Sequence, residues 1–450
     1  MKLRFTSQSS VDSDAEFSNT ARLLNCYVES ADGVEIIKSV LGTTDFADID
    51  NVFLRRMIEM RGDIYAACGG TLYKVTSAGV ISSLGSVTDG DTDLSSNNGV
   101  VCVAANGDFY TWNGTTLAQP TGYPTMDVGS VTFLGQYTII SEQDGRRIAW
   151  SDPADPTTWD ALDFASAEGA DDAILRVEAV NGQLVVFKET TREVWYITES
   201  TDSTLRFVQA AGGVIETGLK AFGLMVPVDN GAFFVGDDNV AYITNGISQK
   251  PVSNRAVETA IKQGAPTRCF YYEDEGHKIA VIKFTDRPAW CYDISTGQWH
   301  ERENGDDLWS AVDSVRLGGE WYVGSDLGAI STLGRVNADG SDPLVRRATS
   351  GTLDFGDWRR IYAAEMDARV GIYDLEGSFD GNEPKCALQI SKDRGKTWGA
   401  DKIKGLGLVG DYDKRLIWRN LGAYRQITVR LSWSDANEVS FLNEVNARVA

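Results

Sequence analysis

The stretch Asp63-Ile-Tyr-Ala-Ala-Cys-Gly-Gly-Thr-Leu-Tyr-Lys-Val75 shows the pattern that decides the fold. Two short runs rich in apolar, aromatic and β-branched residues flank Gly69-Gly70, and such runs are typical of β-strands. Two adjacent glycines accept the positive φ angles that a two-residue hairpin turn requires. The stretch therefore predicts a β-hairpin with one strand on each side of the glycine pair.

The same pattern returns along much of the chain. Asn106-Gly107, a strong signal for a tight turn, separates an apolar run over 100–105 from an aromatic run over 108–112. Further hairpins are predicted from 131–141 into 147–151, 184–188 into 193–198, 232–236 into 240–244, 278–284 into 289–293 and 321–324 into 329–333. The repeat distance of ~40–50 residues is that of a propeller blade. The pattern favours an all-β protein built on a β-propeller, with an irregular β-sandwich as the alternative.

One helix interrupts the strands. Apolar residues at helical spacing follow Ser253, which predicts a short helix with Ser253 as its N-cap, ended by Gly264 and Pro266. The helix is expected to cover an edge of the sheet structure.

The composition changes near residues 336–350, where we expect a domain boundary. Predicted strands over 387–391, 415–418, 426–433 and 438–449 then indicate a β-sandwich-like domain. The expected domains are a propeller with an N-terminal extension over 1–345 and a C-terminal β-sandwich-like domain over 346–450.

Charge is distributed unevenly between these parts. The 450 residues carry a formal net charge of −22, and residues 351–450 hold 15 basic and 15 acidic residues. The other 27 basic and 49 acidic residues lie in 1–350, which therefore carries the whole excess. An acidic surface repels phosphate and argues against a grip on nucleic acid. It suits a wall along which DNA slides, although solubility alone is the simpler interpretation.

The cysteines and the hydrophobic runs argue against export and membrane insertion. The six cysteines are widely spaced, and no two of them form a CxxC motif. Buried free thiols are therefore expected instead of zinc ligands or a disulfide framework. The first ten residues have no apolar core and do not resemble a signal peptide. No run of roughly 18 apolar residues exists, so no membrane partner is expected.

Catalytic and ligand-binding motifs are weak or missing. Only His277 and His300 are available, beside different predicted strands and without a nucleophile motif, so both are expected to be structural or surface residues. Asp89, Asp91 and Asp93 have the spacing that begins a calcium loop, but Leu94 and Val100 occupy positions that need Gly and Glu. There is also no P-loop or dinucleotide-binding glycine motif. No catalytic, cofactor-binding or metal-binding residue is predicted, and no cofactor.

A single Asp-box occurs at Ser391-Lys-Asp393-Arg-Gly395-Lys-Thr397-Trp398. In this motif the Asp side chain bonds turn amides, Gly takes the left-handed conformation and Trp packs beneath the turn. The stretch resembles a hairpin that sialidases contain in several copies. A motif that stabilises a turn does not by itself bring a catalytic site. Trp195, Tyr196, Trp290 and Trp299 could line a sugar groove, although core packing is the expected role of such aromatic residues.

The order of these segments resembles the packaged-DNA stabilisation proteins of short-tailed, podovirus-type bacteriophages, which form the tail hub or nozzle. The similarity runs along essentially the whole chain, with one small departure at 41–44, where the Pro of the family's loop is missing. The segments that carry it are Arg22-Leu-Leu-Asn25-Cys-Tyr27-Val-Glu29, 69–74, 150–156, Glu193-Val-Trp195-Tyr196, 213–218, 252–263, 290–293 with Trp299, 391–398 and 412–425, which begins Tyr412-Asp413-Lys414-Arg415.

The resemblance implies a propeller joined to a C-terminal β-domain and no enzyme activity. It further implies a homo-oligomer, expected to be a hexameric ring, beneath the portal adaptor or head-completion protein. Tail needle, spike or fibre proteins would dock on the ring, and packaged DNA would pass through without sequence-specific binding. The expected localisation is the virion tail, with assembly in the host cytoplasm.

The structural role expected for the chain is to close and extend the portal channel and retain the packaged DNA. The neutral C-terminal part contains three arginines that are candidates for contacts within the ring or with the adaptor: Arg415, Arg419 and Arg425. The alternative is that they form ordinary salt bridges on the surface. The alternative function is a propeller glycosidase, or a carbohydrate-binding tail protein, that acts on host surface polysaccharide.

Overall fold

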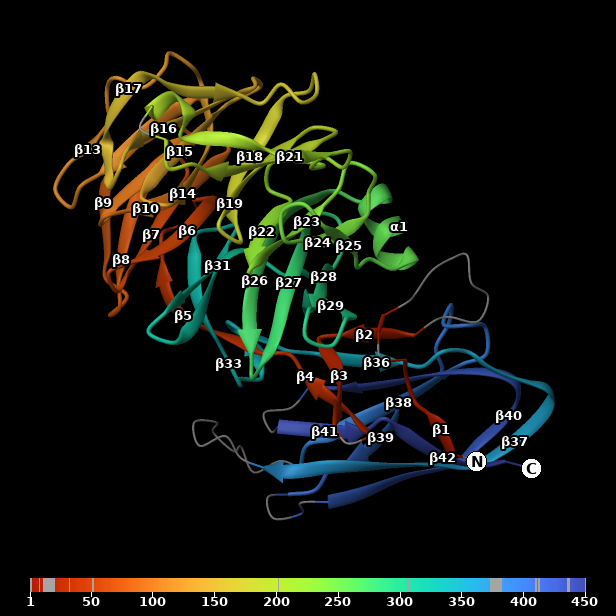
Figure 1. Ribbon diagram of the computed structural model, residues 1–450. Helices are drawn as coiled ribbons and strands as arrows, with labels where there is room; N and C mark the ends of the chain where they lie inside the picture. The colour runs from red at the N-terminus through yellow and green to blue at the C-terminus, as the bar shows by residue number, and fades with distance from the viewer. Residues whose placement is uncertain are drawn as a thin grey trace.

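The computed structural model describes residues 2–7, 9–10, 21–31, 33–50, 52–200, 202–305, 307–372, 383–408, 411, 413–434 and 438–449. It has two parts, a ring of small sheets and a β-sandwich beside it (Figure 1). Tyr412, the first residue of one family-like segment, lies outside the described residues. The prediction of an all-β protein is confirmed, since the helices described are α1 (Arg255–Gln263) and the single turn η1 (Ser203–Leu205).

Seven four-stranded antiparallel units make up the ring within the described residues. In chain order the first five are β6–β9, β10–β13, β14–β17, β18–β21 and β22–β25. Their strands are β6 (Leu54–Met60), β7 (Asp63–Cys68), β8 (Thr71–Thr76), β9 (Ile81–Ser86); β10 (Thr92–Asn97), β11 (Val100–Ala105), β12 (Asp108–Trp112), β13 (Leu117–Ala118); β14 (Val128–Leu134), β15 (Tyr137–Glu142), β16 (Arg147–Asp152), β17 (Asp155–Ser166); β18 (Ile174–Val180), β19 (Gln183–Lys188), β20 (Arg192–Ile197), β21 (Phe207–Ile215); β22 (Met225–Val228), β23 (Gly231–Val235), β24 (Ala241–Thr244), β25 (Gln249–Pro251).

The sixth and seventh blades connect the ring to other parts of the chain. The sixth consists of β26 (Pro266–Asp274), β27 (His277–Phe284), β28 (Ala289–Asp293) and β29 (Gln298–Asn304). The seventh combines β31 (Ala311–Leu317), β32 (Glu320–Ser325) and β33 (Ala329–Gly334) with β5 (Gly42–Asp48) from the N-terminal region. Because β31 also contacts β6, the ring closes, and the propeller is confirmed over the irregular sandwich.

Apolar side chains of facing blades pack together and form the propeller cores. Leu72 and Val101 belong to one such cluster between the first two blades, and Trp150 and Val186 to another between the third and fourth. A β-sheet buries its apolar face only against another layer, so each blade depends on its neighbours.

The predicted hairpin turns form as their residues require. Gly69 and Gly70 have φ angles of +46° and +78°, and Asn106 and Gly107 have +41° and +100°. Positive φ at both central positions defines the hairpin turn that matches the twist of the paired strands.

The helix is present, but its predicted cap is wrong by one residue. The side-chain oxygen of Asn254 accepts the N–H of Val257 at 3.1 Å, so Asn254 is the N-cap. Ser253 instead accepts the N–H of Ala241 and donates to Glu258. Gly264 ends the helix as predicted.

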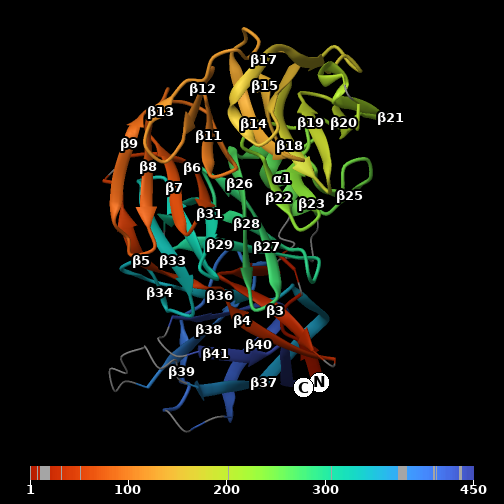
Figure 2. The same ribbon diagram turned by 60° about the vertical axis from the view of Figure 1, so that its left-hand side comes forward.

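The C-terminal part is a β-sandwich that also contains strands from the N-terminal region (Figure 2). Two strands expected over 415–418 and 426–433 form one long strand, β40, that pairs with β37 along its first part and with β38 and β36 along its last. The bounds are β1 (Lys2–Arg4), β2 (Arg22–Leu24), β3 (Cys26–Ala31), β4 (Val34–Ser39), β36 (Arg346–Thr349), β37 (Leu353–Ile372), β38 (Lys385–Ser391), β39 (Lys402–Gly405), β40 (Asp413–Trp433), β41 (Glu438–Leu442) and β42 (Glu444–Val449), with the short β30 (Asp307–Leu308), β34 (Ala338–Asp339) and β35 (Asp342–Pro343) near the seventh blade and the junction.

A continuous path of paired strands joins propeller and sandwich. It runs from blade six through β29, β2 and β36 to β40 and β37. The two parts therefore share a sheet, and a hinge between them would break backbone hydrogen bonds. The domain division at 345/346 stays a prediction.

Candidate functional site at the propeller axis and the sandwich junction

Charged side chains meet on the propeller axis, where the first strands of the blades face one another. Arg176 of β18 donates Nη2 to Asp93 Oδ1 of β10 at 3.1 Å and to Glu178 Oε2 at 3.2 Å. Arg56 of β6 donates Nη1 to Asp313 Oδ1 of β31 at 3.2 Å. All of these groups are buried or largely buried. Protein side chains thus bridge the axis and connect blades that are not neighbours in sequence.

Burial in this axial network shifts the pKa values of some of its charged groups. Burial raises the pKa of the Glu178 carboxyl, although neighbouring Arg176 acts in the opposite direction. Thr132 of β14 donates its hydroxyl to Glu178 Oε1 at 3.1 Å. Burial likewise lowers the pKa of Arg268 on β26, against the influence of Asp313. The first strands of several blades are therefore coupled electrostatically.

The acidic stretch at 89–93 belongs in part to this network. Asp93 is 1% exposed and lies 3.6 Å from Arg56 Nε as well as beside Arg176. Asp89 is exposed and pairs with Arg55 at 3.0 Å. A carboxylate held by two guanidiniums is not available to a cation. In the described parts of the chain, no cluster of three or more His, Cys, Asp or Glu could hold a metal ion.

A second feature is the buried Asn25, which ties blade six to the sandwich. Its Nδ2 donates to the carbonyls of Glu303 at 2.9 Å and Val345 at 2.8 Å, and its Oδ1 accepts the N–H of Glu303 at 3.0 Å. The residue has a φ of +54°, which Asn tolerates better than most residues. Sequence reasoning singled out Asn25 only through the family resemblance, because its two partner residues lie about three hundred residues away.

Both histidines lie at the same junction, around Tyr27. The Tyr27 ring centroid is 4.9 Å from that of His277 and 6.0 Å from that of His300. His277 Nδ1 lies 2.7 Å from Asp293 Oδ2. The structure thus brings together two residues that the sequence placed beside different strands.

Their proton affinities move in opposite directions. The hydrogen bond with Asp293 raises the pKa of His277, while burial lowers the pKa of His300 to about 4. His300 Nε2 has no hydrogen-bond partner among the described residues. Near neutral pH, His300 therefore packs at this junction as a neutral ring.

The Asp-box after β38 has the predicted internal bonds. Asp393 Oδ1 accepts the N–H of Thr397 at 2.8 Å, and Ser391 Oγ accepts the N–H of Gly395 at 2.8 Å. Gly395 has a φ of +82°. The bonds from Thr397 lower the pKa of Asp393 to about 2. The Trp398 ring lies 4.1 Å from the Arg430 guanidinium, so the turn places an aromatic ring against a charge on β40.

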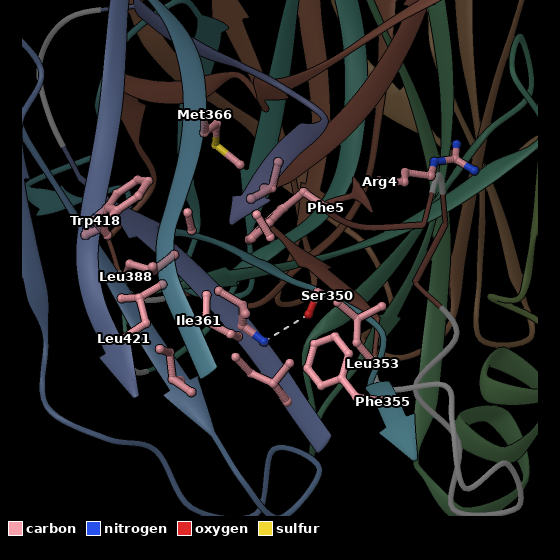
Figure 3. A pocket seen from close by; sticks show the side chains of 16 residues that line it. Arg4, Phe5, Ser350, Leu353, Phe355, Ile361, Met366, Leu388, Trp418 and Leu421 are labelled. Atoms are coloured by element: carbon pink, nitrogen blue, oxygen red, sulfur yellow. Dashed lines mark hydrogen bonds between the residues drawn. The ribbon is translucent and has the colours of Figure 1, made fainter. Parts of the chain in front are cut away.

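An apolar cavity of about 50 Å³ lies between the sheets of the sandwich (Figure 3). Its walls include Ile361, Met366, Leu388 and Trp418. The hydroxyl of Ser350 accepts the N–H of Val429 at 2.9 Å at one end. A space of this size with apolar walls is a packing gap in the core and has few polar groups to orient a ligand.

The three candidate arginines of the C-terminal part are exposed on β40. Arg415 is ion-paired with Glu365, which Arg448 also contacts at 3.0 Å. The paired strands β37 and β40 also expose Trp358, at 73% exposure, and the side chains of four arginines. We call these five the ribbon residues: Trp358, Arg359, Arg360, Arg419 and Arg425.

The aromatic residues considered for a sugar groove lie mostly in the core. Trp195, Trp290 and Trp299 are buried, while Tyr196 is 43% exposed. The six cysteines are free and buried, as expected, and burial raises the pKa of Cys26 to about 12. Among the described residues, no helix is long and apolar enough to cross a membrane.

Comparison with known proteins gives the same two-part division. A family model described as "Bacteriophage P22 Gp10, beta-propeller" matches residues 26–338, and one described as "Bacteriophage P22 Gp10, beta-sandwich" matches residues 352–449. The chain belongs to the bacteriophage P22 Gp10 family. The resemblance to tail-hub proteins of short-tailed phages and the predicted propeller with a sandwich are thereby confirmed.

The individual proteins compared with this Gp10-family chain share little sequence with it. The tail hub protein gp10 of Salmonella phage P22 is 22% identical over 400 residues, which cover 81% of this chain and 80% of that protein. Among solved structures, selenomethionine-substituted virginiamycin B lyase from Staphylococcus aureus has 12% identity and a TM-score of 0.46, covering 65% of this chain and 98% of that chain. The WD40 propeller domain of Doa1 has 9% identity and a TM-score of 0.44, covering 67% and 100%.

Proposed function

We propose that this chain is a structural tail-hub protein of a bacteriophage virion. The observation that carries the proposal is the match of both Gp10 domain models, in order, over most of the chain. The architecture suits a part that must stay rigid, because β5 closes the propeller and a shared sheet joins it to the sandwich.

A ring of copies supplies the channel in this proposal. The axis of each propeller is bridged by the pair Arg176–Asp93, which joins the fourth and second blades, so DNA cannot pass through a single propeller. A passage for DNA therefore has to be enclosed between copies, and a closed cyclic arrangement, with six copies as expected from the family, achieves this. The acidic excess in residues 1–350 gives such a passage a surface that does not bind phosphate.

The partners follow from this position in the tail. A portal adaptor would contact one side of the ring, and a needle, spike or fibre protein the other, while the particle assembles in the host cytoplasm. The role requires no reacting group, so the protein is proposed to have no enzyme activity. No observation on the molecule favours the glycosidase or carbohydrate-binding alternative.

DNA retention tests the proposal directly. DNA-filled heads of the cognate phage that lack this chain should leak their DNA, and added purified protein should restore nuclease resistance and add density at the neck in electron micrographs. Heads that retain DNA equally well without the protein would contradict the proposal. Release of reducing ends from host polysaccharide would instead favour the glycosidase.

A further inference from the structure

An acidic pocket lies between the sixth and seventh blades. It has a volume of about 270 Å³, and the charged side chains that line it are Asp45, Asp48 and Asp339. Neutral groups that carry oxygen form part of the wall, among them the amide of Asn304 and the hydroxyl of Ser331. None of the described residues that line the pocket is Lys, Arg or His.

A β-bulge brings two of the carboxylates to one face of the seventh blade. Asp45 of β5 lies opposite Ser331 of β33, and Asp48 lies opposite Ala329. The two aspartates are three residues apart, so in a regular strand they would point to opposite faces. Phe46 is the extra residue at the register shift between them. Because Ser331 and Ala329 are two residues apart on β33, the aspartates opposite them share a face.

The third carboxylate comes from β34, which runs beside β5 (Figure 2). Asp339 is 6% exposed, and its Oδ1 accepts hydrogen bonds from Arg302 Nη2 at 2.8 Å and from Thr43 Oγ1 at 3.3 Å. Its Oδ2 is buried and has no hydrogen-bond partner among the described residues. A buried carboxylate oxygen without a donor is costly, so a positively charged donor in the pocket beside it would be stabilised.

A second buried acceptor favours the same kind of ligand. Oδ1 of Asn304 also has no hydrogen-bond partner in the described part of the chain, while Nδ2 of the same amide donates to Asp342 Oδ2 at 3.4 Å. Both of these atoms on pocket-lining residues accept hydrogen bonds, so a ligand that donates them fits the pocket better than an anion does.

Positive charge from the protein compensates one of the three carboxylates. Arg302 is fully buried, forms an ion pair with Asp339 and lies over the Trp309 ring, with 3.9 Å between the guanidinium carbon and the ring centroid. Asp45 and Asp48 are exposed, and neither forms an ion pair with another described residue. Two of the three negative charges at the pocket are therefore available to a ligand.

We infer that this acidic pocket binds an organic cation that carries a guanidinium or a primary ammonium group. The pocket is larger than a single ion needs, and among the described residues no three acidic groups lie close enough together to hold a metal ion. A guanidinium or ammonium has several N–H donors, so it can bond oxygens that are spread over a wider site. The cation can be a free polyamine or the side chain of an arginine or lysine in a protein. The inference goes beyond the proposed tail-hub role and does not depend on it.

Calorimetric titration of the full chain with agmatine, which has a guanidinium at one end and an ammonium at the other, tests the site at constant ionic strength. We expect saturable binding, weakened about tenfold or more in the double variant Asp45→Asn/Asp48→Asn, because the pocket loses two negative charges on one face. Both substitutions keep the shape of exposed side chains, so circular dichroism should show an unchanged fold. The matched control is Asp127→Asn/Glu216→Gln, which removes two exposed charges elsewhere on the propeller and should bind agmatine as the unaltered protein does.

A second ligand, N-acetyl-arginine methylamide, identifies the source of the cation. Binding of this capped arginine as tightly as agmatine would assign the pocket to a protein side chain, while binding of agmatine alone would assign it to a free polyamine. No saturable agmatine binding, an unchanged affinity in the folded Asp45→Asn/Asp48→Asn variant, or equal weakening in the control variant would overturn the inference. Calcium that displaces agmatine at equal concentration would also overturn it.

Discussion

At the scale of single residues, Asp93 shows how little a local motif says about a buried group. Within the sequence it belongs to an acidic stretch with calcium-like spacing, yet in the fold it faces Arg176 and Arg56 from other blades. Removing one partner of a buried ion pair leaves an uncompensated charge, which is more costly than losing an exposed pair.

Asp93→Ala is therefore expected to lower the free energy of unfolding by about 3–5 kcal/mol. Urea unfolding followed by tryptophan fluorescence measures it. Asp89→Ala, which removes an exposed pair with Arg55 from the same stretch, should cost less than about 1 kcal/mol. Similar effects of the two substitutions would contradict the assigned role of the axial network.

His300 gives the junction a defined response to acid. Its pKa is about 4 in the fold and ~6.5 in an unfolded chain, so the unfolded state binds the proton first as the pH falls. Stability from the neutral ring is complete above pH ~6.5 and is lost towards pH 4, with about 2 kcal/mol gone at pH 5.

The comparison of His300→Phe with the unaltered protein isolates this effect. The variant should lose about 2 kcal/mol less between pH 7.5 and pH 5 in urea titrations at each pH. The contribution of His277 to the pH dependence of stability has the opposite sign. Its raised pKa stabilises the fold at low pH, and this stabilisation is lost as the pH rises through that pKa. A His277→Phe control should therefore be relatively weaker at pH 5. Parallel pH profiles for the unaltered protein and His300→Phe would contradict the prediction.

At the scale of elements, strand β5 closes the ring, and two glycines in register test how tightly it does so. Gly42 pairs with Gly334 of β33. A Cβ on Gly42 would lie 2.4 Å from the carbonyl oxygen of Ala338 and 2.5 Å from that of Val336, whereas a Cβ on Gly334 would meet nothing within 4 Å.

Gly42→Ala should destabilise the protein by about 1–3 kcal/mol, the usual cost of overpacking, and should expose the seventh blade to faster amide exchange. Gly334→Ala should change stability by no more than about 0.5 kcal/mol. Hydrogen-exchange mass spectrometry and urea unfolding measure both effects. A tolerated Gly42→Ala would show that β5 is not held closely.

Elements also show what sequence can and cannot predict. Hairpins at Gly69-Gly70 and Asn106-Gly107 were predictable because the turn chemistry is local. Closure by β5 was not, because β5 pairs with a strand nearly three hundred residues away. The sequence predicts two strands where β40 is continuous, because polar residues and a glycine interrupt its alternation. The axial and junction contacts were not predictable either, because the residues that form them lie in different blades or domains.

At the scale of the whole molecule, charge separates the two ends of the chain. Residues 1–350 carry the full acidic excess, while the ribbon residues Arg359, Arg360, Arg419 and Arg425 give the sandwich exposed positive charge. Complementary surfaces of this kind accelerate association and fix its orientation. They are suited to contacts between copies in the proposed ring.

Reversing Arg419 and Arg425 to Glu should weaken ring assembly and make the remaining assembly less sensitive to salt, as measured by sedimentation velocity or by electron microscopy with the adaptor. Arg415 is a poorer choice because its bond to Glu365 confounds a loss of assembly with a loss of stability. Arg61→Glu, on an exposed propeller turn, is the control. Normal rings from the double variant would exclude Arg419 and Arg425 from the interface.

The pairing of β5 with β33 and of β1 with β42 also bears on biosynthesis. Each joins segments that lie nearly three hundred or more residues apart in the chain, so neither domain can be completed until the later of its two paired strands has been synthesised. Such non-local pairing slows folding and leaves strand edges uncovered in the meantime. A cell that makes many copies at once would therefore hold a pool of incomplete molecules, for which chaperones and proteases compete.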